Sequence, residues 1–227
     1  MESQAPPRAV QGHSISDGMR AAWPLAVAVG VFGISWGVLA QDAGMSLLAA
    51  TLMSATTFAG SAQFAAVSII GEGGSLGAAI VAAILLNARY GPIGLSVAPA
   101  LGGSTARRFI TSQLVIDESW AIANQGGGRF NSRLLIGAGL LIYFAWVAGT
   151  VAGIIGGDVL GDPERLGFDA AFPALFLSLL APQVRERRAL VVAIAGAAIA
   201  LALVPFTQAG VPIIAAALAC FLGLRRR

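Results

Sequence analysis

The sequence predicts an all-α membrane protein, a polytopic helix bundle of about six to seven apolar segments with at least one segment broken or re-entrant. Of the 227 residues, 57% are hydrophobic and 11% are charged, whereas soluble domains carry about 25% charged residues. Several apolar runs reach the roughly 18 residues that can cross a hydrocarbon core. One of these runs is interrupted near its middle by the polar stretch "NARYGP". Composition thus predicts the class, and the interruption predicts the break.

The first three segments follow a polar tail that comprises residues 1–20. Trp23–Ala40 begins at a tryptophan placed like an interfacial anchor. Met45–Ile70 ends at the glycine-rich break Gly71–Gly74. "NARYGP" splits Leu76–Leu101 into halves of about 11 residues, or roughly 16 Å at a rise of about 1.5 Å per residue. Neither half is long enough to cross a bilayer alone.

The polar stretch Gly102–Arg133 separates these segments from the rest of the chain. An acidic loop, the cluster "RERR" and the stretch "PFTQAG" separate the later segments, which are Leu134–Ile155, Ala170–Leu180, Ala189–Val204 and Val211–Leu224. Most connections are short. We therefore expect residues 21–227 to form a single transmembrane domain.

The basic residues indicate how the chain is oriented in the membrane. All 14 are arginine, and arginine collects in cytoplasmic loops, so the net charge of +3 indicates topology and not a nucleic-acid partner. The N-terminal tail and Gly102–Arg133 should both be cytoplasmic. Three segments lie between them, however, and an odd number of crossings would place Gly102–Arg133 outside. One segment should therefore not cross, and we expect it to be Leu76–Leu101, as a re-entrant hairpin or a helix broken at mid-depth.

The sequence contains little that could support catalysis. Cys220 is the only cysteine and His13 the only histidine, which excludes a Cys/His metal site. No phosphate-binding glycine loop or metal-spaced His/Glu set is present. We therefore expect neither an enzyme nor a bound cofactor.

A polar stretch, "SATTFAGSAQF" (Ser54–Phe64), lies inside the second apolar segment. In a regular helix Ser54, Thr57 and Ser61 would share one face, and Gln63 would lie roughly opposite. One interpretation is tight packing of small residues, with Gln63 hydrogen-bonded to a neighbour. The other is that the chain loosens near Gly60 and exposes backbone groups and hydroxyls to a cavity, where the N-terminus of a half-helix faces an anionic group.

Arg89 lies in the middle of the third segment. An arginine at the bilayer centre costs at least about 2.5 to 3.5 kcal/mol, so it normally faces a bundle interior, a cavity or a carboxylate. The alternative is that its side chain extends to the interface from the end of a short helix. Arg89 could orient a substrate carboxylate or lock a helix pair, and Asn87 could supply a hydrogen bond.

Three carboxylates have two interpretations each. Asp117 and Glu118 lie in "FITSQLVIDESWAIAN", where apolar and polar residues are mixed as in an interfacial helix, and Asp169 precedes "AAFPALF". They can form a solvated face, or they can carry a coupled proton, a common task of carboxylates in transporters. Asp117 or Glu118 could also pair with Arg89.

Four stretches together resemble one protein family. "MSATTFAGSAQF", "LLNARYGPIGLSVAP", "IDESWA" and "LGFDAAFPALFLSLLAP" follow in the order and spacing of the AzlC family, the large subunits of bacterial branched-chain amino acid exporters. The likeness covers nearly the whole chain from Gly18 onward. It implies a multi-pass protein of the bacterial inner membrane that exports valine, leucine and isoleucine, and in some members methionine or toxic analogues.

The resemblance also implies a partner, the small four-helix AzlD-type membrane subunit. Tyr90 stands where relatives often have histidine, which removes a titratable group from that position. Our interpretation is a secondary transporter driven by an ion gradient. The candidate substrate-binding residues are Ser54, Thr57, Gly60, Ser61, Gln63, Asn87 and Arg89, and the candidates for proton coupling are Asp117, Glu118 and Asp169. The rival interpretations are a passive pore and a non-transporting scaffold subunit.

Overall fold

The structure, a computed structural model of the chain, describes residues 13–126, 128–160, 177, 184, 187–207 and 211–219. Helices make up its regular structure, apart from an isolated antiparallel bridge between Asn124 and Phe130. The predicted all-α class is therefore confirmed. The expected segment Ala170–Leu180 lies outside the described residues except for Leu177, and Asp169 and Cys220 also lie outside them.

Three helices of the described part are long and apolar enough to cross a membrane. They are α1 (Ile15–Asp42), α8 (Ser132–Leu160) and α10 (Arg187–Leu203), which continues into the 3-10 helix η1 (Val204–Phe206). They contain the expected segments Trp23–Ala40 and Leu134–Ile155 and most of Ala189–Val204. The short helix α11 (Val211–Ala217) packs against α10 and α4.

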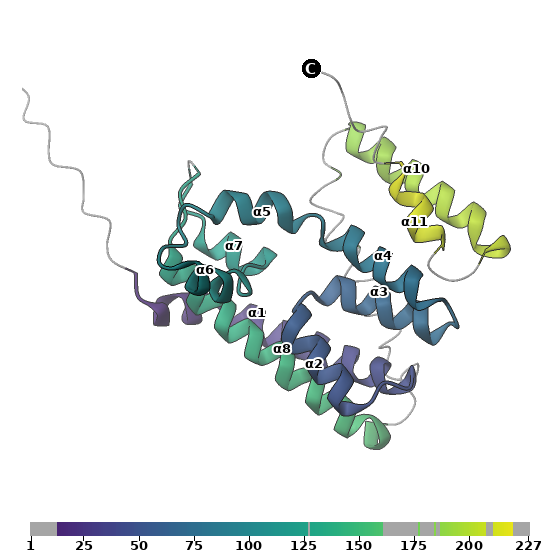
Figure 1. The fold of residues 1–227 in the computed structure, drawn as a ribbon, viewed down its shortest axis with the longest axis horizontal. Coiled ribbons are helices and arrows are strands. Elements are labelled where there is room, and N and C mark those ends of the chain that lie inside the picture. The colour runs from purple at the N-terminus through teal and green to yellow at the C-terminus, as the bar shows by residue number, and fades with distance from the viewer. Residues whose placement is uncertain are drawn as a thin grey trace, which may run out of the picture.

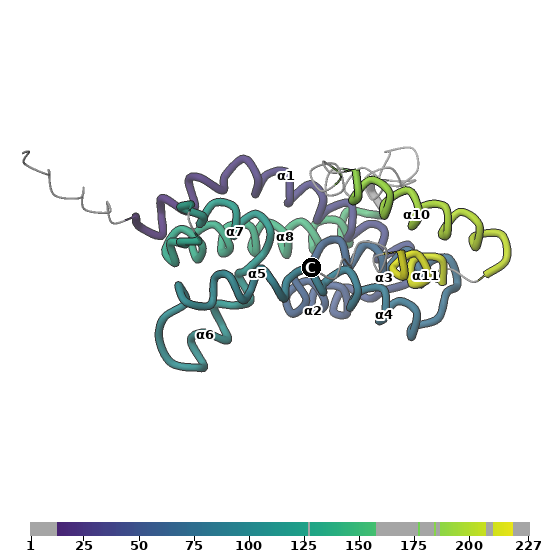
Figure 2. Tube along the Cα trace, turned by 90° about the horizontal axis from the view of Figure 1, so that it is seen from above, coloured from purple at the N-terminus to yellow at the C-terminus, as the bar shows by residue number. Residues whose placement is uncertain are grey.

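Helices α1 and α8 run side by side along the length of the bundle (Figures 1 and 2). They are parallel, because Gly18 faces Leu134 at their starts and Gly37 faces Gly153 farther along. A Cβ atom on Gly37 would overlap the carbonyl oxygen of Thr150, so the two backbones touch there. Glycine at such contacts lets apolar helices pack closely without a hydrophobic drive between them.

The second apolar segment enters the bundle and returns to the same end. It forms α2 (Leu47–Thr57) and α3 (Gly60–Gly71), which are separated by Phe58 and Ala59. At about 1.5 Å per residue each helix is roughly 17 Å long, too short for a core about 30 Å thick. A Cβ atom on Gly71 would lie 3.7 Å from the Cβ of Ala43, which just precedes α2. The α2–α3 pair is therefore a re-entrant hairpin.

The third segment crosses the bundle with a bend. Helices α4 (Leu76–Asn87) and α5 (Tyr90–Val97) are bent by 41° at their break, and they follow one another in Figure 1. Val97 packs with Leu134 and Leu135 at the start of α8, opposite the end where α4 begins. The expected break is confirmed, and of the two expected forms the structure has the broken helix. The reversal of the chain lies instead in the second segment.

Backbone conformation explains which segment reverses. Ala88 and Arg89, between α4 and α5, keep helical angles (φ −55° and −60°), so the chain continues in nearly the same direction. Phe58, between α2 and α3, has the left-handed angles φ 41° and ψ 51°. A left-handed residue interrupts a helix and turns the chain. The sequence predicted the α4–α5 break and offered a break near Gly60 as one of two interpretations, but it did not indicate this difference in direction.

The polar stretch after α5 lies at the same end of the bundle as the N-terminal end of α1. Nη1 of Arg133 donates a hydrogen bond to the carbonyl oxygen of His13 at 3.5 Å. Two short helices, α6 (Thr105–Ser112) and α7 (Asp117–Ala123), lie in this stretch. The turn between them reaches inward, because Nε2 of Gln113 donates to the carbonyl oxygen of Thr56 at 2.6 Å.

Candidate functional site

Three interruptions of helices meet at one central cavity. They are the α2–α3 break, the α4–α5 break and the turn between α6 and α7. The cavity has a volume of about 210 Å³, and α1 and α8 complete its wall; its lining residues are Leu25, Ala28, Val29, Phe32, Phe58, Gly60, Ser61, Arg89, Tyr90, Ile116, Asp117, Glu118, Ile142 and Trp146. Backbone that leaves the helical state at membrane depth is tolerated where it is buried in protein or lines a cavity.

The α2–α3 break places the start of α3 at the cavity. Phe58 is buried, and its ring lies edge-on to Tyr143 with the centroids 5.0 Å apart. Oε1 of Gln63 accepts a hydrogen bond from the backbone N–H of Ala59 at 3.2 Å, which holds the entry into α3. The first N–H groups of a helix have no intrahelical partners, and this end favours negative charge. Gly60 and Ser61 therefore present an anion-friendly helix end to the cavity.

Arg89 supplies the positive charge of the cavity. Its Nη2 lies 3.0 Å from Oδ2 of Asp117 and donates to Oγ of Ser61 at 3.1 Å. It also approaches the hydroxyl of Tyr90 at 3.4 Å. The Arg89–Asp117 pairing is confirmed, and the guanidinium points into the bundle. Nε of Arg89 is buried and has no hydrogen-bond partner within the described part of the chain.

The negative charges come from the start of α7, which does not span the membrane. Asp117 and Glu118 lie in its first turn, where carboxylates interact favourably with the backbone dipoles. Burial raises the pKa of the Glu118 carboxyl, and the neighbouring Asp117 charge also raises it. Glu118 thus takes up a proton more readily than an exposed glutamate does.

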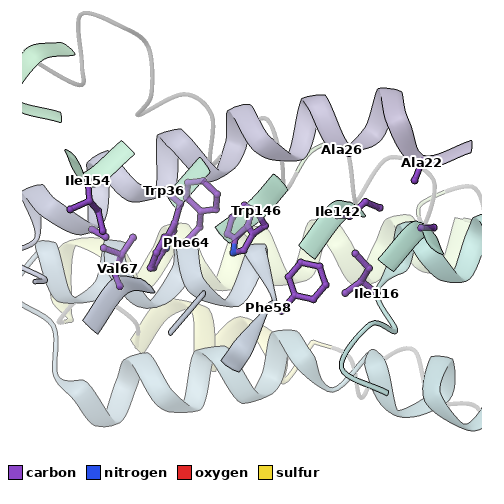
Figure 3. Packing of buried hydrophobic residues seen from close by; sticks show 13 residues of the cluster. Ala22, Ala26, Trp36, Phe58, Phe64, Val67, Ile116, Ile142, Trp146 and Ile154 are labelled. Atoms are coloured by element: carbon purple, nitrogen blue, oxygen red, sulfur yellow. The ribbon is translucent and has the colours of Figure 1, made fainter. Parts of the chain in front are cut away.

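The rest of the wall is apolar. Figure 3 shows Phe58, Ile116 and Ile142 beside the indole of Trp146, and α1 adds Phe32 and its neighbours. The cavity therefore has one charged side, with donors for a carboxylate and acceptors for an ammonium group, and one aromatic and aliphatic side. Its volume is below the roughly 300 to 1,000 Å³ of sites for drug-sized ligands. This arrangement suits a small zwitterion with an apolar side chain.

The structure brings five of the sequence-predicted site residues to the cavity: Gly60, Ser61, Arg89, Asp117 and Glu118. Thr57 is exposed, and Asn87 lies just before the α4–α5 break; neither lines the cavity. Asp169 lies outside the described residues.

Ser54 and Gln63 lie behind the cavity wall. Both are fully buried, and Nε2 of Gln63 donates to Oγ of Ser54 at 3.1 Å. The opposite placement expected for a regular helix does not apply, because the left-handed residue Phe58 turns α3 back toward α2. The structure has the break near Gly60 that was the alternative to a regular helix. Hydrogen bonding of Gln63 to a neighbour was one of the two interpretations, and it is what the structure has.

Sequence reasoning missed two aromatic residues of the cavity wall. Trp146 and Phe32 lie in the middle of long apolar helices, where one more aromatic residue carries no distinguishing pattern. Only the tertiary structure identifies them, because they become lining residues through the packing of α1 and α8 around the breaks.

Comparisons with known proteins place the chain among membrane proteins. The family model described as AzlC protein matches residues 24–160. A membrane protein of Archaeoglobus fulgidus is 35% identical over 207 residues, which cover 89% of this chain and 90% of that protein. The inner membrane protein YgaZ of Escherichia coli is 27% identical over 228 residues, covering 94% of this chain and 89% of YgaZ.

A further relative has a named role. The branched-chain amino acid transport protein AzlC of Bacillus subtilis is 29% identical over 160 residues, which cover 66% of this chain and 60% of that protein. No solved structure matches the chain.

Proposed function

Since the chain belongs to the AzlC family, we propose that it is a secondary transporter that exports branched-chain amino acids from the cytoplasm across the bacterial inner membrane. The family is one of transport-related membrane proteins and not of enzymes. Valine, leucine and isoleucine are the proposed substrates, with methionine or analogues as further ones. The Bacillus subtilis relative, described as a branched-chain amino acid transport protein, supports this choice.

The central cavity is the observation that carries the proposal. It combines an arginine, two carboxylates and a helix N-terminus with an aromatic and aliphatic wall in about 210 Å³. In this proposal the substrate carboxylate binds the guanidinium of Arg89 and the start of α3, since an arginine fork matches a carboxylate geometrically. The substrate ammonium group binds at Asp117 or Glu118, and the apolar side chain lies against Trp146 and Ile142.

Proton coupling is proposed through the carboxylates at the start of α7. Glu118 is half-buried and close to the charges of Asp117 and Arg89, so uptake of a proton changes what the cavity can bind. Asp169 remains a candidate for the same role. The N-terminus and Gly102–Arg133 are proposed to be cytoplasmic, and a small AzlD-type membrane subunit is proposed to complete the transporter.

Leucine export from inside-out membrane vesicles tests the function. Vesicles that contain the chain and its small partner are given labelled leucine and an imposed pH gradient. We expect leucine to accumulate above its outside concentration, to saturate, and to be displaced by valine and isoleucine. Arg89→Ala should abolish accumulation. Leu95→Ala is the matched control on α5, because Leu95 is 78% exposed and does not line the cavity.

Two outcomes would contradict the proposal. Leucine that only equalises across the membrane and never saturates indicates a passive pore. Full transport by the small partner without this chain indicates a scaffold.

A further inference from the structure

A series of buried hydrogen bonds connects the indole N–H of Trp146 to the backbone carbonyl oxygen of the same residue. Oε1 of Gln63 accepts from the indole Nε1–H at 3.1 Å, and Nε2 of Gln63 donates to Oγ of Ser54. The hydroxyls of Ser54 and Thr150 are 2.8 Å apart, and the Thr150 hydroxyl donates to the carbonyl oxygen of Trp146 at 2.9 Å. All three polar side chains are fully buried.

The donors at one end of this series determine which atom donates in each of its hydrogen bonds. An indole N–H and a backbone N–H can only donate, so the oxygen of the Gln63 amide must face Trp146 and Ala59. Since the Thr150 hydroxyl gives its proton to the Trp146 carbonyl, the proton between the two hydroxyls comes from Ser54. Rotating the indole away would leave the Gln63 oxygen with one buried partner fewer, which is unfavourable.

Aromatic neighbours hold the same indole from other sides. The rings of Trp36 and Phe64 lie 6.3 Å and 6.2 Å from it, measured between centroids. The opposite edge faces the cavity, because a Cβ atom on Gly60 would lie 3.2 Å from Cη2 of Trp146. The indole is thus a fixed wall with its polar atom turned away from the cavity.

We propose that Trp146 limits the size of the apolar side chain that the cavity accepts, and that Gln63 is the positioning residue that holds the indole at this limit. The inference rests on the function proposed above. Ser54 and Gln63 then act on the substrate through Trp146 and do not touch it. Gly60 contributes to the same size limit, since a side chain at this position would occupy space next to the indole that the substrate needs.

Binding of alanine, leucine and phenylalanine to the purified protein with its small partner, measured by calorimetry, tests this assignment. The unaltered protein should prefer leucine to phenylalanine. Trp146→Phe should raise the ratio of phenylalanine to leucine affinity about tenfold or more, the scale of a hydrophobic pocket that gains room. Gln63→Met keeps the length of the side chain but loses the hydrogen bond to the indole. It should raise the ratio of phenylalanine to leucine affinity by a smaller factor. Alanine affinity should stay the same in both.

Trp120→Phe is the matched control, because Nε1 of Trp120 bonds to Ser96 and its ring does not line the cavity. An unchanged affinity ratio in Trp146→Phe, or equal losses for alanine and leucine, would overturn the inference while leaving the proposed function standing. Failure of the unaltered protein to bind any of the three would remove the proposed function. If Trp146→Phe does not fold, Gly60→Ala replaces it and should weaken leucine binding relative to alanine; an unchanged ratio there overturns the inference too.

Discussion

At the scale of single residues, the cavity depends on how one guanidinium is shared. Nη2 of Arg89 serves Asp117 and Ser61 together, so the orientation of the arginine fork depends on a carboxylate from α7 and a hydroxyl from α3. Two elements far apart in the sequence therefore position the group proposed to bind the substrate carboxylate. A change in either partner should alter affinity without removing the charge.

Ser61→Ala removes the hydroxyl that accepts from Arg89. This hydroxyl helps to orient the guanidinium that is proposed to bind the substrate carboxylate, so leucine affinity should fall in calorimetry on the purified protein. Ser68→Ala is the matched control, since Ser68 lies on the same helix and does not line the cavity. Equal affinities for Ser61→Ala and the unaltered protein would mean that the Ser61 hydroxyl serves helix packing only.

The half-buried carboxyl of Glu118 predicts a dependence of stability on pH. Burial raises its pKa, so its contribution to stability is present below the pKa of the unfolded chain and is lost as the pH rises through the higher folded-state pKa. Glu118→Gln, which stays neutral, should therefore melt at a higher temperature than the unaltered protein, by a margin that grows with pH. Thermal unfolding between about pH 4 and 8 measures this margin.

Glu72→Gln provides the comparison, because Glu72 is an exposed carboxyl in the turn after α3. A margin for Glu118→Gln that does not grow with pH, or that grows no more than the margin for Glu72→Gln, would contradict the raised pKa of the Glu118 carboxyl.

At the scale of elements, the broken helices α2 and α3 pack against the α1–α8 pair. Trp146 and Ile142 of α8 and Phe32 of α1 form cavity wall, so the distance between these two helices sets the width of the cavity. That distance is short because glycines remove side chains from the contact. In a bilayer, such contact packing replaces the hydrophobic drive of a soluble core.

Gly149→Ala should lower the amount of folded protein. A Cβ atom on Gly149 would overlap the carbonyl oxygen of Gly30, and a backbone atom cannot move aside as a flexible side chain can. Gly196→Ala on α10 is the control, because its Cβ would lie at an ordinary 3.5 Å from the nearest atom. The monodisperse fraction in size-exclusion chromatography and the melting temperature report the difference. Equal values for the two variants would show that α1 and α8 can move apart without loss of stability.

At the scale of the whole molecule, the number of crossings fixes the orientation of both polar regions. Helix α1 crosses, the α2–α3 hairpin returns, and the bent α4–α5 helix crosses again. The even count agrees with the distribution of arginine, since Arg20 and the arginines of Gly102–Arg133 then lie on one side. The contact between Arg133 and His13 is consistent with this.

Single cysteines in a Cys220→Ala background test the topology. Cysteines at Ser104 and Ser132 should be labelled only from the cytoplasmic side by an impermeant thiol reagent, and a cysteine at Glu72, in the turn after the hairpin, only from the periplasmic side. Labelling of Ser104 and Glu72 positions from the same side would mean that α4–α5 does not cross. Periplasmic labelling at both Ser104 and Ser132 would invert the proposed orientation.

The sequence by itself determined the class of this protein and the break in its third segment, and it offered a break near Gly60 and a pairing of Arg89 with Asp117 or Glu118 as alternatives. Hydropathy, charge and polar residues inside apolar runs are properties of the chain alone, and a bilayer penalises them in a known way. Tertiary structure decided which segment reverses, because the reversal depends on the left-handed backbone of Phe58 held by its buried ring. It also decided that Gln63 faces Trp146 and not the cavity, because the direction of a side chain after a break follows from packing between helices and not from helical periodicity.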